Sequence, residues 1–151
     1  MRFALAVLLG LVVGSVFVAI GETISSSLYP PPAGLDLTHP EDLSKFIESL
    51  PPGAFILVLL AHADGAFAGA AVCQWISKSN SLRGAMTVGT LFLIAGIGNL
   101  VTIPHPVWFA VLDLLIYLPL AWFGGMLARA IWAAGQDEPS ADEPHKNESS
   151  K

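Results

Sequence analysis

The sequence predicts an all-α fold, a four-helix transmembrane bundle with a short amphipathic helix in its outer loop. Four apolar runs, at residues 3–20, 53–76, 84–103 and 107–132, fill most of the 151-residue chain. Helices of about 18–25 residues are long enough to cross a hydrocarbon core of about 30 Å. The composition agrees, because 54% of the residues are hydrophobic and only 13% are charged. We therefore assign residues 1–134 to one four-span transmembrane domain.

The first apolar run, residues 3–20, is interpreted as a retained span. A cleaved signal peptide is the alternative, because Arg2 precedes the run and a small-residue site, Ala19-Ile20-Gly21, follows it. However, the run exceeds the usual signal core of about 7–15 residues. Gly10 and Gly14 also have the spacing at which membrane helices pack closely.

The outer loop, residues 21–52, is predicted to contain a helix at residues 39–50 that Pro51 ends. Thr38 and Glu41 have the spacing of a capping box, and Pro40 suits a first helical turn. The apolar stripe of this helix consists of Leu43, Phe46, Ile47 and Leu50. Because the polar face is mainly acidic, we expect the stripe to rest on the bundle, either as a strap or as a lid over a cavity.

Basic residues predict the orientation. Those near the predicted spans are Arg2, Lys78, Arg83 and Arg129 at one end and Lys45 alone at the other. The positive-inside rule then places the N- and C-termini in the cytoplasm. Residues 135–151 are predicted to be a disordered acidic cytoplasmic tail, since they carry five acidic residues and two lysines. The net charge of −5 argues against a nucleic-acid partner.

Polar residues of the predicted spans gather near one depth. The cluster consists of Glu22, His62, Asn99, Asp113 and Tyr117, with Asp64 and His105 as secondary candidates. A charged side chain facing lipid costs about 2.5–3.5 kcal/mol, so these groups are expected to point into the bundle and to find partners there. Asp64, however, points about 200° away from His62 around the same helix.

The helix faces that carry His62 and Asp113 continue in small residues. From His62 the face runs through Gly65, Ala66, Gly69 and Cys73. From Asp113 it runs through Tyr117, Ala121, Gly124 and Ala128. Since small residues let helices approach closely, residues 53–76 are predicted to be the central helix.

Three chemistries fit this polar cluster. It can be a hydrogen-bond network that specifies helix packing, or a set of groups that carries a proton or a cation during transport. It also includes enough nitrogen and oxygen donors for a zinc-like or iron-like site, with the metal unknown. An enzyme is the least favoured class, because no nucleophile elbow, dinucleotide fingerprint or P-loop is present. The sequence indicates no cofactor. The single cysteine, Cys73, is interpreted as a packing residue of the core.

Several segments resemble an uncharacterised family of small four-span bacterial integral membrane proteins. They are Tyr29-Pro30-Pro31-Pro32, Leu60-Ala61-His62-Ala63, Gly96-Ile97-Gly98-Asn99, Pro104-His105-Pro106-Val107-Trp108-Phe109 and Tyr117-Leu118-Pro119-Leu120-Ala121-Trp122-Phe123-Gly124-Gly125. The resemblance covers roughly residues 1–132 and implies a location in the bacterial inner membrane. It implies an apolar residue where this chain has Asp64, which argues against an essential role for that carboxylate.

These observations together favour a multi-pass inner-membrane protein with an accessory or structural role. Its partners are then the lipid bilayer and a second copy of the chain or another membrane protein. The alternative is a small proton- or cation-linked transporter that uses the polar cluster, and the third is a metal-dependent membrane enzyme.

Overall fold

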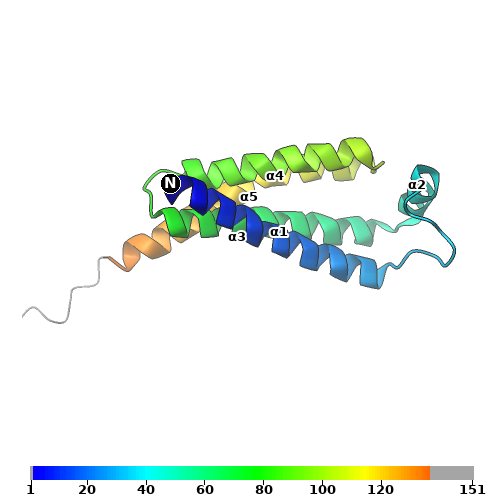
Figure 1. Cartoon of the computed structure of the whole chain (residues 1–151), viewed down its shortest axis with the longest axis horizontal. Helices are drawn as coiled ribbons and strands as arrows, with labels where there is room; N and C mark the ends of the chain where they lie inside the picture. The colour runs from blue at the N-terminus through cyan, green and yellow to red at the C-terminus, as the bar shows by residue number, and fades with distance from the viewer. Residues whose placement is uncertain (1, 137–151) are drawn as a thin grey trace, which may run out of the picture.

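The computed structural model describes residues 2–136 and contains five helices in that range, with no strand (Figure 1). They are α1 (Arg2–Leu28), α2 (Pro40–Ser49), α3 (Pro52–Ser77), α4 (Arg83–Thr102) and α5 (Val107–Ala134). All except α2 are long and apolar enough to cross a membrane. The predicted all-α class is confirmed, together with four helices of spanning length. Of the acidic tail, residues 137–151 lie outside the described part of the chain.

The four long helices run side by side, and α2 lies beyond one end of them (Figure 1). The first residues of α1, the α3–α4 loop and the last turns of α5 lie at the opposite end. We call these the α2 end and the Lys78 end. Helix α3 packs against all three other long helices, as predicted for a central helix.

Glycines bring α1 into backbone contact with α3. A Cβ atom added to Gly10 would lie 2.5 Å from the carbonyl oxygen of Gly69, and one added to Gly14 would lie 2.5 Å from that of Gly65. No larger residue fits at such a distance without a backbone shift. The close packing predicted for these two glycine pairs is therefore confirmed.

The faces predicted on α3 and α5 are buried in the bundle. On α3, His62 and all four small residues of its face are buried. On α5, the buried residues include Asp113, Tyr117, Ala121, Gly124 and Ala128. A Cβ atom on Gly124 would overlap the carbonyl oxygen of Phe67, so α5 also approaches the α3 backbone closely.

Helix α1 is longer than its apolar run. The expected span ended at residue 20, whereas the helix continues to Leu28. The hydroxyl groups of the extension are satisfied within the helix, because Thr23 and Ser27 each donate a 2.7 Å hydrogen bond to a carbonyl four residues earlier. The extension matters for the site, since Glu22 is held by a helix and not by a loop.

The capping box predicted at the start of α2 is wrong. His39 occupies the N-cap position, and no side chain caps the helix. The Thr38 hydroxyl instead donates a 2.6 Å hydrogen bond to Oδ1 of Asp36, which also accepts the Thr38 amide at 3.0 Å. Asp side chains commonly form such local turns in competition with helix capping. The bonds from Thr38 lower the pKa of Asp36 below its ordinary value of 3.8.

We predict that Gly14→Ala destabilises the protein by about 1–3 kcal/mol, because the new methyl group collides with the Gly65 carbonyl and the Phe92 ring. Thermal unfolding in detergent measures the change. Gly98→Ala is the matched control, since nothing lies within 4 Å of a Cβ atom at Gly98. Alanine is about 1 kcal/mol better than glycine inside a helix, so this control should equal or exceed the wild type. Equal losses in the two variants would contradict the close α1–α3 contact.

Candidate functional site

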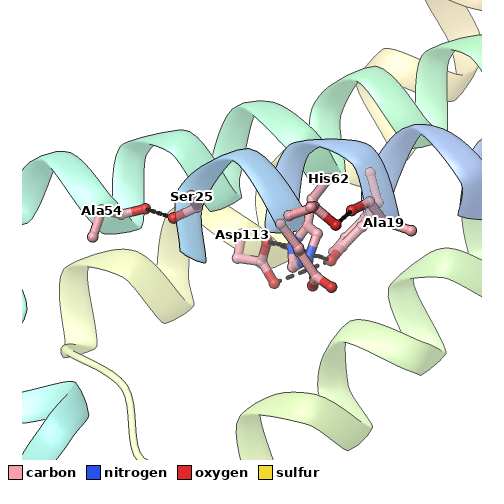
Figure 2. Close-up of polar contacts among 8 residues, drawn as sticks. Ala19, Ser25, Ala54, His62 and Asp113 are labelled. Atoms are coloured by element: carbon pink, nitrogen blue, oxygen red, sulfur yellow. Dashed lines mark hydrogen bonds and ion pairs between the residues drawn. The ribbon is translucent and has the colours of Figure 1, made fainter. Parts of the chain in front are cut away.

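The site centres on a contact between His62 of α3 and Asp113 of α5. The His62 Nδ1 atom lies 2.6 Å from Asp113 Oδ1, and Asp113 is 0% exposed. Figure 2 shows the two side chains facing each other between their helices. A buried carboxylate needs hydrogen-bond donors or a compensating charge, and His62 supplies a nitrogen at hydrogen-bond distance.

Tyr117 completes the buried part of the site from one helical turn beyond Asp113. Its hydroxyl donates to Asp113 Oδ2 at 3.1 Å and lies 3.0 Å from His62 Nδ1. The ring fits because Gly96 of α4 has no side chain, and a Cβ atom there would lie 2.7 Å from the Tyr117 hydroxyl. Sequence reasoning missed this role of Gly96, because periodicity along α4 does not show which neighbour a glycine faces.

Glu22 of α1 approaches the other side of the His62 ring. Its Oε1 atom lies 3.5 Å from His62 Nε2, and its side chain is 52% exposed. The imidazole is therefore placed between a buried and an exposed carboxylate. A neutral imidazole carries one N–H group, so hydrogen bonds to both carboxylates require one more proton. The three residues together can hold and exchange that proton.

A cavity of about 280 Å³ opens beside the exposed part of the cluster, between α1 and α4. Its polar wall includes Glu22, His62, Asn99 and Tyr117, and its apolar wall includes Phe92. Asp113 does not line the cavity but lies in contact with His62 and Tyr117. The cluster therefore combines a fully buried residue, Asp113, with three residues that line the cavity, Glu22, His62 and Tyr117.

A second cavity of about 280 Å³ lies under α2. The predicted apolar stripe of α2 lines it, facing residues such as Tyr29, Phe55 and Phe109 of the bundle. Glu22 and Asn99 belong to the walls of both cavities. The two cavities are therefore neighbours, and α2 covers the one farther from His62.

The remaining members of the predicted cluster are placed differently. Asn99 lines both cavities, but its side chain makes no hydrogen bond within residues 2–136. His105 lies apart, where its Nδ1 atom is 2.7 Å from the Ile103 carbonyl oxygen and its ring stacks on Phe109 at 5.0 Å. The structure therefore joins Glu22, His62, Asp113 and Tyr117 and leaves His105 at the second cavity.

Asp64 contradicts the expectation that the acids of the spans all point inward. Its side chain is exposed on the outer surface of α3, beside Phe17, Ile20 and Leu60 in a shallow groove between α1 and α3. Within the part of the chain that the structure describes, no hydrogen bond or ion pair holds its carboxylate. The cause is the turn of about 200° from His62, which carries Asp64 to the opposite side of the helix.

The hypothesis of a metal centre finds no support in the described residues. Among residues 2–136, no group of three or more His, Cys, Asp or Glu side chains is arranged to hold a metal ion. Each ring nitrogen of His62 instead faces a carboxylate, with Asp113 beside Nδ1 and Glu22 beside Nε2.

The chain matches no known family model, no curated protein and no solved structure. What the site can do therefore follows from its own geometry.

We predict that Tyr117→Phe lowers the free energy of unfolding by about 1–3 kcal/mol, because the Asp113 carboxylate loses a donor in a buried position. Chemical or thermal unfolding in detergent measures the loss. The chain has two tyrosines, so Tyr29→Phe serves as the matched control and should change stability by less. If the two variants unfold alike, the Tyr117 hydroxyl does not support Asp113.

Proposed function

We propose that this protein is a small proton-linked carrier of the bacterial inner membrane, with its cavities open toward the outside. The observation that carries the proposal is the position of His62 between a buried carboxylate, Asp113, and a cavity-facing carboxylate, Glu22. Histidine exchanges protons near neutral pH, and carboxylates within spans commonly serve as proton relays. A proton can therefore pass between the cavity and Asp113 through the imidazole.

The orientation rests on the basic residues. Arg2, Lys78, Arg83 and Arg129 all lie at the Lys78 end, where Arg2 donates to the Ile76 carbonyl oxygen at 3.1 Å and Arg129 to that of Asn80 at 3.0 Å. The positive-inside rule favours the cytoplasm for this end. Both termini then lie in the cytoplasm, and α2 lies outside.

Thiol labelling of intact cells tests this orientation. A membrane-impermeant maleimide should label Ala33→Cys, which is exposed in the loop before α2, and should not label Lys78→Cys until the cells are opened. The native Cys73 is buried and serves as the unlabelled background. Labelling of Lys78→Cys in intact cells would reverse the proposed orientation.

The bundle is closed between the cluster and the Lys78 end. Gly10 and Gly69 bring α1 and α3 together there, and a Cβ atom on Gly84 of α4 would lie 2.9 Å from the Cys73 sulfur. Transport would require this part to open while the cavity side closes, as in alternating access. The volume of about 280 Å³ lies just below the range of about 300–1,000 Å³ typical of small-molecule sites. A solute of few atoms therefore fits the proposal.

Proton flux into liposomes tests the relay. Purified protein is reconstituted with a pH-sensitive dye inside, and proton entry driven by a potassium gradient with valinomycin is measured with and without small candidate solutes outside. We predict that Asp113→Asn and His62→Gln slow the entry by about tenfold or more, because each removes a proton-exchanging group. Asp64→Asn is the matched control, since it removes a carboxylate of the same span as His62 that lies outside the cluster.

The same measurements separate the carrier from an accessory or structural role, the second candidate. The complete burial of Asp113 favours that candidate, because the contacts of Asp113 and Tyr117 with His62 hold α3 and α5 in register. A purely structural cluster predicts equal proton entry for the wild type and Asp113→Asn, together with easier unfolding of the variant. That combination would overturn the carrier.

A further inference from the structure

The Asp64 carboxylate lies near the middle of α3. It is 12 residues after the first residue of the helix and 13 before the last, or about 18–20 Å from either end. Its side chain points out of the bundle and reaches neither Glu22 nor His62, whose contacts are made on the other side of the helix. In a bilayer this surface faces the lipid near the midplane.

A carboxylate in this position requires a partner. Charged groups at the bilayer centre are strongly disfavoured and normally pair with another polar group or line a wet cavity. The short Asp side chain cannot reach the aqueous interface from the midplane, which lies about 15 Å from either edge of a hydrocarbon core of about 30 Å. Since the described residues supply no partner, it has to come from outside them.

Asp64 lines a shallow groove between α1 and α3. Gly21 and Ala61 form its floor, where a Cβ atom on Gly21 would overlap that of Ala61. Phe17, Ile24 and Leu60 stand beside this floor, and the groove has a volume of about 190 Å³. Ile24 and Leu60 are themselves exposed, so the surface beside Asp64 is apolar and is not covered by another helix of the bundle.

No lysine or arginine of the described spans lies at the depth of Asp64, because those in the spanning helices lie at the Lys78 end. Of the seven Lys and Arg residues, four lie at the Lys78 end, Lys45 lies in α2, and two lie in the sequence after residue 136. A second copy that lies beside the first in the same orientation therefore brings no lysine or arginine to the depth of Asp64. We propose that the groove binds a membrane-spanning helix of a different protein that carries a lysine or arginine near its centre. This interaction surface is independent of the cavity and of proton transfer.

Association in liposomes tests the proposal with a synthetic probe. The full chain carries a donor dye at Ala33→Cys, and a transmembrane peptide of leucine and alanine with one central lysine carries the acceptor. We predict that energy transfer reports at least about tenfold tighter association for the lysine peptide than for the same peptide with a central leucine. Asp64→Leu should abolish this difference. Glu22→Gln is the matched control and should leave it intact, because Glu22 opens into the cavity on the other side.

Three outcomes would overturn the proposal. The first is equal association of the lysine and leucine peptides with the wild type. The second is a preference for lysine that persists in Asp64→Leu. The third is self-association of the chain without peptide that Asp64→Leu removes, which would assign the groove to a second copy. Unfolding of Asp64→Leu in detergent serves as the folding control and should match the wild type, because the carboxylate makes no bond within the described chain.

Discussion

The burial of one carboxylate constrains the rest of this structure. Asp113 is 0% exposed, and an acid in that position is tolerated only where donors surround it. His62 and Tyr117 supply those donors at 2.6 and 3.1 Å. Because His62 belongs to α3 and the other two residues to α5, this requirement fixes both the rotation and the vertical register of the two helices. It also determines which edge of the imidazole remains free to meet α1.

The glycine contacts between α1 and α3 set how near that third helix comes. Gly14 and Gly65 remove the side chains that would separate the two backbones, and the extension of α1 carries Glu22 to the level of His62. A bulkier pair would displace α1 and lengthen the 3.5 Å approach between Glu22 and the imidazole. Packing and site geometry thus depend on the same few small residues.

Helical periodicity predicted the faces but not their neighbours. The spacing from His62 and from Asp113 identified the small residues that are now seen to be buried with them. The same spacing put Asp64 on another side, yet it could not show that this side has no helix against it. The end of α1 was missed because hydropathy falls at Gly21 while the helix continues through polar residues. Thr38 was misread as a cap because a single sequence does not show that Asp36 competes for it.

The one-sided cavity has an electrical consequence. Where an aqueous cavity reaches partway into a bilayer, most of the membrane voltage falls across the part that stays closed. In this bundle the closed part lies between His62 and the Lys78 end, where α1, α3 and α4 meet without a gap at Gly10, Cys73 and Gly84. A charge that moves through the closed part would cross most of the field, at about 2.3 kcal/mol per elementary charge for each 100 mV. Protonation of His62 from the cavity side would then be nearly independent of the membrane voltage, which would act on transfer across the closed part.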